Sequence, residues 1–428
     1  MRVFKNLSQM QLNQLIVRNN ESNEQIISVV SEIVDEVKAE GDQALNKYSL
    51  KYDCFNYNGA FVSEQEFEDA GKCISDSLKE AISMAKNNIF TFHKNQQQVY
   101  EIIETQPGVK CWQKAVPIEK VGLYIPGGTA PLISTVLMLG IPAKIAECKE
   151  VILCTPPDKS GNINPAILYT ANLLGINKVF KAGGAQAIAA MAYGTETIPK
   201  VDKIFGPGNQ YVTAAKQYVS LNGTAIDMPA GPSELLVIAD ETANPDFVAA
   251  DLLSQLEHGI DSQVVLLSSD EKAIEETIAC LKQQIKELPR KDIAAKALEN
   301  SFAILLKDLN ECIQWSDRYA PEHLILNCID APLLAQEVAN AGSVFIGQYA
   351  PESAGDYASG TNHTLPTNGY ARMYSGLSTE SFCKVITYQN ITEEGIRNIG
   401  PCIEEIAEAE QLQAHKNAVT IRLKSLND

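Results

Sequence analysis

The sequence lacks several features that would place it in a specialised class of protein. Its ten cysteines show no Cys-x-x-Cys pairing, and a chain of 428 residues does not need disulfides to hold its core together, so we expect reduced thiols. Asp and Glu number 53 against 35 Lys and Arg, which gives a formal net charge of -18. Because nucleic acids and anionic membranes bind clustered basic residues, neither is an expected partner.

We also expect neither an apolar leader nor an uninterrupted membrane-spanning segment. Residues 1–6 lead into a polar helical stretch and not into the apolar core of a signal peptide. Residues 121–143 carry no charge and are long enough to cross a bilayer, but Pro126, Pro131 and Pro142 break them repeatedly. We therefore expect a cytoplasmic protein with no membrane partner.

The remaining composition is that of an ordinary globular protein, with 45% hydrophobic and 21% charged residues and enough length for two or three domains. From Val121 onward, short apolar segments alternate with helical stretches, and the strand candidates are residues 151–154, 179–181 and 203–205. A further apolar run at 235–239 restarts a sheet. Alternation of this kind predicts an α/β protein with parallel, doubly wound sheets.

Three glycine-bearing turns punctuate the first of these sheets, at residues 124–128, 182–186 and 206–209. The last two each follow a strand and open a helix, which places them at the carboxyl edge, where such sheets bind nucleotides and other ligands. None of the turns is a Gly-x-Gly-x-x-Gly. Tight turns that simply require glycine are therefore an equally good interpretation of the pattern alone.

Polar residues are concentrated in the segment from Ala350 to Pro366. It follows a strand-like run, and its glycines and prolines predict an irregular loop that holds Glu352, Asp356 and His363. A single Asp in such a loop ordinarily closes a turn. A functional role for this loop therefore requires partners elsewhere in the chain.

Candidate partners lie on two other segments. Gln255 and His258 are three residues apart near the end of a helix and share a face, although a histidine there also interacts favourably with the helix dipole. Glu322 and His323 are adjacent at the entrance of a strand, where their side chains diverge and suit two different proton-transfer roles. A capping Glu and a half-buried His are the alternative. His93, in a polar run, is expected to be solvated.

The C-terminal helical tail adds Glu410 on an apolar stripe and His415 five residues later. The protein has five histidines, and four of them stand in polar contexts in the second half of the chain. With Asp356 and Gln255, His258, His323, His363 and His415 supply nitrogen and oxygen ligands. Such a set suits zinc, manganese or cobalt in a site that stays open to substrate, and not a closed Cys-rich structural site.

Taken together, these segments resemble the histidinol dehydrogenase family over nearly the whole chain. The blocks that carry the resemblance are Val121 to Pro131, Gly183 to Ala190, Gly206 to Lys216, Gly231 to Glu234, Ser254 to Gly259, Ala320 to Leu324, Glu352 to Thr367 and Glu410 to Val419. The resemblance implies two doubly wound, aldehyde-dehydrogenase-like α/β domains, and NAD and one Zn2+ per subunit as cofactors. It also implies oxidation of L-histidinol through L-histidinal to L-histidine, and a homodimer in which the tail of one subunit completes the site of the other.

The resemblance also implies roles for individual residues. The zinc ligands would be Gln255, His258, Asp356 and His415, the last supplied by the partner chain, and all four would also contact substrate.

His323 would be the general base and a substrate contact, and Glu322 would activate the water that adds to the aldehyde. Ser233 and Glu410 match further substrate-contacting positions, the latter suited to the ammonium group. The NAD-contacting positions are Tyr124, Gln186 and Asn209. His363 is given no role beyond supporting its loop, and no cysteine is expected to be essential.

The expected domains are an N-terminal helical arm over 1–25, a first α/β domain from 26–120 with 235–380, a second, NAD-binding α/β domain over 121–234, and a C-terminal helical tail over 381–428. Two other functions remain possible on the sequence. One is a metal-dependent amide or amine hydrolase, and the other is a dimeric, non-catalytic protein that binds an imidazole ligand.

Overall fold

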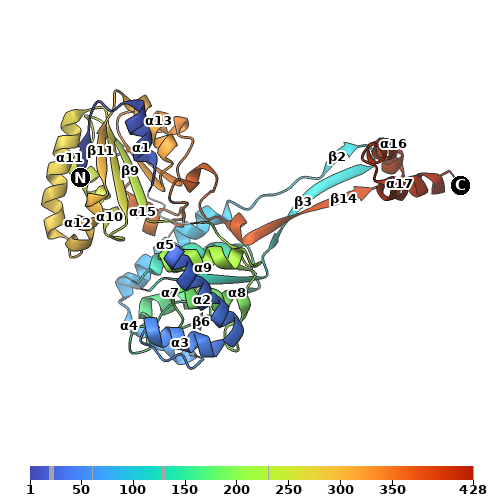
Figure 1. Cartoon of the computed structure of the whole chain (residues 1–428), viewed down its shortest axis with the longest axis horizontal. Helices are drawn as coiled ribbons and strands as arrows, with labels where there is room; N and C mark the ends of the chain where they lie inside the picture. The colour runs from blue at the N-terminus through green and yellow to red at the C-terminus, as the bar shows by residue number, and fades with distance from the viewer. Residues whose placement is uncertain (19–23, 60, 128–130, 230, 428) are drawn as a thin grey trace.

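The protein consists of two α/β units and a long arm that projects from them (Figure 1). The computed structural model describes residues 1–18, 24–59, 61–127, 131–229 and 231–427. Gly128, the last residue of the first glycine turn, lies outside these ranges.

The first unit is built on a six-stranded sheet in the order β1-β11-β10-β9-β12-β13, in which every pair is parallel. Its strands are β1 (Arg2–Phe4), β9 (Glu234–Ala239), β10 (Gln263–Ser268), β11 (Phe302–Leu305), β12 (His323–Asn327) and β13 (Ser343–Ile346). Alternate residues of a strand point to opposite faces, so both faces of β9 need apolar partners. Leu235 and Val237 pack into one cluster, and Leu236 and Ile238 into another.

Helices therefore cover both faces of this sheet. The first cluster includes residues of α10 (Pro245–Leu256), α11 (Glu271–Gln284) and α12 (Lys291–Glu299). The second includes residues of α1 (Gln9–Ile16), α13 (Leu309–Tyr319) and α14 (Ala331–Leu334). The short 3-10 helices η1 (Ile285–Glu287) and η2 (Ala335–Glu337) follow α11 and α14.

The second unit is built on a five-stranded parallel sheet in the order β6-β5-β4-β7-β8. Its strands are β4 (Lys120–Tyr124), β5 (Glu150–Cys154), β6 (Lys178–Phe180), β7 (Lys203–Phe205) and β8 (Ala225–Ile226). The order reverses at β4, which is the first strand along the chain. The prediction of an α/β fold with two doubly wound sheets is thus confirmed, and the reversal lies beside β4, at the kind of carboxyl edge where such sheets bind ligands.

Helices also cover both faces of the second sheet. One layer contains α2 (Glu24–Glu40), α3 (Asp42–Tyr52), α8 (Gly184–Tyr193) and α9 (Gln210–Ser220). The other contains α4 (Glu64–Cys73), α6 (Ile133–Ile145) and α7 (Pro165–Leu173), with α5 (Asp76–Lys94) packed on α6.

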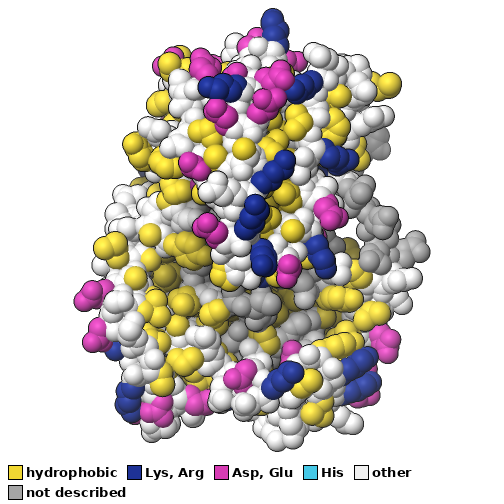
Figure 2. Space-filling view, turned by 90° about the vertical axis from the view of Figure 1, so that its left-hand side faces the viewer, with side chains coloured by type: hydrophobic (Ala, Val, Ile, Leu, Met, Phe, Trp, Pro, Cys, Tyr) yellow, Lys and Arg dark blue, Asp and Glu magenta, His cyan; other side chains and the backbone are white. Residues whose placement is uncertain are grey.

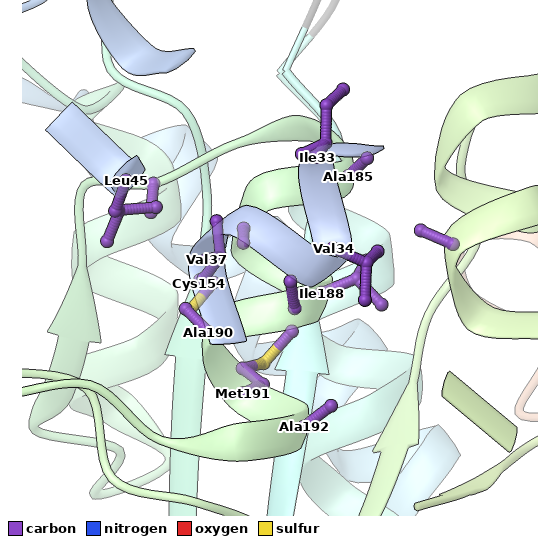
Figure 3. Packing of buried hydrophobic residues seen from close by; sticks show 14 of the residues in the cluster. Ile33, Val34, Val37, Leu45, Cys154, Ala185, Ile188, Ala190, Met191 and Ala192 are labelled. Atoms are coloured by element: carbon purple, nitrogen blue, oxygen red, sulfur yellow. The ribbon is translucent and has the colours of Figure 1, made fainter. Parts of the chain in front are cut away.

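The helices that precede the second sheet in sequence belong to its layers, and this differs from our expectation. Residues 26–120 were expected to join the first α/β domain, but α2 packs on α8 and α9, and α4 and α5 pack on α7 and α6. Figure 3 shows Val34 and Val37 of α2 among Ile188 and Met191 of α8. We therefore propose that residues 24–94 be assigned to the second unit, because its helices bury their apolar faces.

The arm consists of three antiparallel strands and two helices at its tip (Figure 1). Its elements are β2 (Ile103–Gln106), β3 (Val109–Pro117), β14 (Cys383–Ile391), α16 (Glu393–Ala409) and α17 (Gln413–Ser425). β14 pairs with β3 from Cys383 opposite Pro117 to Ile391 opposite Val109. The expected all-helical tail from 381 is therefore wrong at its start, and β2 and β3 lie in the arm instead of in the first domain.

Two further local expectations are corrected. The N-terminal segment was expected to be helical. It begins instead with β1, which pairs in parallel with β11 and extends that edge of the sheet. The loop after β13 contains a short helix, α15 (Glu352–Tyr357), where irregular structure was expected. The 3-10 helices η3 (Tyr370–Arg372) and η4 (Thr379–Phe382) follow it.

The surface shown in Figure 2 carries acidic and basic side chains interspersed with apolar ones. Within the described ranges, we find no helix that is both long enough and apolar enough to pass through a bilayer.

Candidate active site

The predicted metal and catalytic residues meet at the amino edge of the six-stranded sheet. β9 begins at Glu234 and β12 begins at His323, side by side at this edge. The crossover helix α10 runs back against the direction of the parallel strands, so its C-terminal end, with Gln255 and His258, returns to the same edge. α15 packs on α10 and brings Asp356 there. The site is thus formed by the starts of two strands, the end of one helix and one short helix.

A cluster of oxygen and nitrogen atoms at this edge fits a divalent cation. Potential ligand atoms of His258, Glu352 and Asp356 all lie within 4.8 Å of one another. His258 Nε2 is 3.9 Å from Asp356 Oδ2. Gln255 is completely buried, and among the described residues neither its amide oxygen nor its amide nitrogen has a hydrogen-bond partner. A buried amide without a partner costs free energy, so a ligand for its oxygen is expected here.

His323 is buried beside this cluster with one ring nitrogen fixed and the other free. Its Nδ1 lies 3.2 Å from the carbonyl oxygen of Glu234, and because a carbonyl only accepts, Nδ1 carries the hydrogen. Its Nε2 lies 3.8 Å from Asp356 Oδ1 and has no hydrogen-bond partner in the part of the chain that the structure describes. Burial lowers the pKa of the imidazole to about 3. The ring is therefore neutral, with a lone pair on Nε2 that faces the cluster.

Glu322 is buried next to His323 and is held by the same residue of β9. Its Oε2 accepts a hydrogen bond of 2.9 Å from the backbone N–H of Glu234. Burial, together with the charges of Glu234 and Asp356, raises the pKa of this carboxyl well above its usual range. A carboxyl of this kind is a stronger base when ionised than an exposed one.

Glu352 is a buried carboxylate to which our sequence interpretation gave no role. It is 1% exposed, and its Oε2 accepts a hydrogen bond of 3.2 Å from Ser254. Its Oε1 lies 3.6 Å from His323 Nδ1 and has no hydrogen-bond partner within the described ranges. Burial, with Asp356 and Glu322 close by, raises the pKa of its carboxyl well above the usual range. The only hint in the sequence was its spacing of four residues from Asp356, which places both on one helical face.

His363 connects the loop of Asp356 to the second unit. Its Nδ1 donates to the carbonyl oxygen of Asp356 at 3.0 Å, so its Nε2 accepts from Thr135 Oγ1, 3.2 Å away on α6. Burial lowers the pKa of the His363 imidazole to about 4. The expected supporting role for His363 thus corresponds to contacts with both α/β units.

His93 also binds this loop, which contradicts the expectation that it is solvated. Its side chain is fully buried, with Nδ1 2.9 Å from the carbonyl oxygen of Ile89 and Nε2 3.2 Å from Asn362 Nδ2. Asn362 Nδ2 also donates to the carbonyl oxygen of Met138 on α6 at 2.7 Å. Two residues of the loop, Asn362 and His363, are therefore bound to helices of the second unit.

Ser233 lies at the same edge, and Glu410 and His415 lie elsewhere. Ser233 precedes β9 and is partly buried. Glu410 follows the last residue of α16, and His415 is in the first turn of α17, both at the tip of the arm and both exposed (Figure 1). One chain therefore does not bring these two residues to its own cluster.

The three predicted NAD-contacting residues line one cavity of about 1330 Å³ at the carboxyl edge of the five-stranded sheet. Tyr124 Oη accepts from the N–H of Gly184 at 3.0 Å, and Gln186 Nε2 donates to Asp53 Oδ2 at 3.2 Å. Asn209 caps α9 through the N–H groups of Tyr211 and Val212. The cavity lies at the strand order reversal, where doubly wound sheets bind ligands.

The glycine of the third turn is required by close approach of the backbone. Gly206 has a φ of +129°, and a Cβ at this position would lie 2.1 Å from the carbonyl oxygen of Tyr124. The interpretation of Gly206 as a residue that a tight turn requires is therefore correct. Tyr124 and Asn209, close to this turn, still line the cavity.

Comparison with known proteins gives one consistent family. The family model described as histidinol dehydrogenase matches residues 16–423. A histidinol dehydrogenase of Bacteroides thetaiotaomicron is 58% identical over 426 residues, with 100% of each chain covered. One from Shigella sonnei is 52% identical over 421 residues, covering 98% of this chain and 96% of the relative. The crystal structure of histidinol dehydrogenase from Elizabethkingia anophelis superposes with a TM-score of 0.97 at 57% identity, covering 100% of this chain and 99% of that one.

Proposed function

Because this chain belongs to the histidinol dehydrogenase family, we propose that it oxidises L-histidinol through L-histidinal to L-histidine, with NAD as the hydride acceptor. These are the last steps of histidine biosynthesis. The observation that carries the proposal is the neutral, buried His323, whose free Nε2 faces a cluster of oxygen and nitrogen atoms that fits a cation. A base without a charge beside a cluster of metal ligands suits the removal of a proton from an alcohol.

We propose Gln255, His258 and Asp356 as ligands of one Zn2+ per subunit, with His415 of the partner subunit as the fourth. The partnerless amide of Gln255 and the proximity of His258 to Asp356 support this assignment. Nitrogen and oxygen ligands of this kind suit zinc. When bound, zinc would hold the imidazole and amine of histidinol and so orient the substrate. Glu352 is close enough to His258 and Asp356 to offer a further ligand oxygen.

In the first oxidation, His323 Nε2 would take the proton from the substrate hydroxyl while hydride leaves the carbon that bears this hydroxyl. The bond from Nδ1 to the Glu234 carbonyl would hold the ring in the required tautomer. In the second oxidation, Glu322 would take a proton from the water that adds to the aldehyde carbon. The raised pKa of the Glu322 carboxyl supports this role as a base.

The substrate contacts would be Ser233, Gln255, His258, His323 and Asp356 from one chain and Glu410 and His415 from the other. Ser233 is next to Glu234 at the amino edge, which supports its assignment. A carboxylate such as that of Glu410 pairs well with the substrate's ammonium group.

NAD would bind in the cavity beside β4, in contact with Tyr124, Gln186 and Asn209. The cofactor supplies the hydride acceptor for both oxidations. The volume of the cavity and its position at the strand order reversal support a dinucleotide site.

We propose a homodimer in which the arm of each subunit reaches the other subunit's site. The arm projects from the body, and the helices at its tip and the turn between them carry exposed apolar side chains at Ile406, Leu412 and Ile421. Exposed apolar side chains gathered on a projecting element are typical of an interface. This arrangement would bring Glu410 and His415 to a cluster that their own chain does not reach.

NAD reduction by zinc-loaded protein with L-histidinol tests the proposal. We expect two NADH for each histidine formed. If zinc-loaded protein forms no NADH, the proposal is wrong. Release of ammonia or amine without NADH would then indicate a hydrolase, and binding of histidinol without turnover would indicate a binding protein.

A further inference from the structure

The Arg18 guanidinium is buried between β9 and α13, in a segment that no catalytic assignment above uses. Its Nε and Nη2 donate to Glu234 Oε1 and Oε2 at 2.6 Å and 2.8 Å. The two side chains are 12% and 4% exposed. A planar guanidinium that binds both oxygens of a buried carboxylate fixes its orientation as well as its position.

The same guanidinium holds the end of α13. Its Nη1 donates to the carbonyl oxygen of Tyr319 at 2.7 Å, and its central carbon lies 3.7 Å from the centroid of the Tyr319 ring. Tyr319 is the last residue of α13, and Ala320 follows in a left-handed conformation with a φ of 52°. Pro321 then leads directly to Glu322 and His323. Arg18 therefore binds both the start of β9 and the turn that delivers the catalytic pair.

The backbone of Glu234 holds both members of that pair. Its N–H donates to Glu322 Oε2 at 2.9 Å, and its carbonyl accepts from His323 Nδ1 at 3.2 Å. A rotation of these peptide groups would displace the proposed base and the proposed water-activating carboxylate together. The Glu234 side chain, which is bound by Arg18 and by the backbone of Asn368, is fixed against such a rotation.

We propose that Arg18, acting through Glu234 and Tyr319, is a positioning residue for both proton-transfer groups of the reaction. The inference rests on the proposed function for its catalytic meaning. A buried ion pair is weak evidence for a gain in stability, because desolvation offsets the attraction. A fixed geometry for the two groups bound to Glu234 is the specific consequence of the bidentate contact.

Replacement of Arg18 by methionine tests the inference, with Arg18→Lys and Arg318→Met alongside. Arg318 is the matched control. Its Nη1 donates to Asn13 of α1, so this arginine too joins the N-terminal segment to α13, but it does not contact Glu234. For Arg18→Met we expect kcat to fall about 10- to 100-fold, since small misplacements of reacting groups have effects of that size. The KM for NAD should stay unchanged, because the cavity lies in the other unit.

Arg18→Lys should retain part of the kcat lost in Arg18→Met, because lysine keeps the positive charge but cannot bind both carboxylate oxygens in one plane. Arg318→Met should keep wild-type kcat. If folded Arg18→Met protein keeps wild-type kcat, the inference is wrong. If Arg18→Met does not fold, the Arg18→Lys variant carries the same comparison with the unaltered protein.

Hydrogen exchange gives a readout that does not depend on turnover. Peptides covering residues 231–236 should exchange faster in Arg18→Met than in Arg318→Met, because without Arg18 the Glu234 N–H is held less firmly against its acceptor, Glu322 Oε2. Equal exchange in the two variants would overturn the inference. Absence of NADH from the unaltered protein would overturn the proposed function instead, and the exchange result would still decide whether Arg18 holds β9.

Discussion

The imidazole of His363 donates from Nδ1 to the backbone carbonyl of Asp356, 3.0 Å away, and so holds a proposed metal ligand in place from outside the cluster. Groups that orient metal ligands in this way typically change metal affinity about 10- to 100-fold when removed. We expect His363→Phe to weaken zinc binding by this factor, as measured by competition with a chelator. His363→Gln retains a donor and should lose less. Equal affinities for both variants and the unaltered protein would show that the contact does not orient Asp356.

His323→Ala should keep zinc and histidinol binding but lose turnover. The His323 ring is next to the proposed ligands, but its free Nε2 suits proton transfer. Loss of a positioned general base lowers rates about 10²- to 10⁴-fold. Zinc content and substrate binding can be measured on the same preparation. Loss of zinc from this variant would mean that His323 is a ligand and not the base.

Mixed dimers test the shared site. His323→Ala and His415→Ala should each be inactive alone, because one lacks the base and the other lacks the proposed ligand given to its partner. After subunit exchange, a mixed dimer would contain one site with both residues intact, so some activity should return. No recovery, despite exchange proven with differently tagged subunits, would indicate that each site is built within one chain.

Asp251 provides a pH-dependent prediction for the metal-free protein. It lies one turn before Gln255 on α10, and burial raises the pKa of its carboxyl to about 7. The folded state binds the Asp251 proton more tightly than the unfolded state does. The stability that this proton contributes is therefore fully present below about pH 4 and is lost as the pH rises through about 7. Asp251→Asn cannot ionise. Its free energy of unfolding in urea should therefore fall less between about pH 5 and pH 8.

The control for this measurement is Asp292→Asn, at an exposed position of α12. It should show the pH dependence of the unaltered protein. If Asp251→Asn shows the same dependence as well, Asp251 is not the group that titrates.

Strands and turns in the second unit could be predicted because their patterns are local. The expected strands at 151–154 and 203–205 match β5 and β7. Tyr124, Gln186 and Asn209, chosen from the resemblance, line one cavity because Tyr124 ends a strand and the other two lie at the starts of helices at the same sheet edge.

Burial of single polar residues could not be predicted in the same way. His93 stands in a polar run, and only its contact with Asn362, distant in sequence, places it in the core. Glu352 similarly becomes buried because α15 packs on α10. Such burial depends on which elements meet, and hydrophobic periodicity does not contain that information.

The partners of whole elements were also hidden. The apolar stripe of α2 predicts that one face is buried but does not indicate which sheet buries it. The expected assignment of residues 26–120 to the first domain therefore differs from the packing of these helices on the second sheet's layers. β14 was missed because its residues are mostly exposed and lack an apolar alternation. Its pairing with β3 gives the arm its length.

The loop that carries Asp356 is attached at two places, to α10 of one unit through α15 and to α6 of the other through Asn362 and His363. A metal bound by Asp356 and by the end of α10 would therefore make the melting of the two sheets one cooperative event. Zinc-loaded protein should unfold in a single calorimetric transition. Removal of the metal should allow the two units to unfold at separate temperatures.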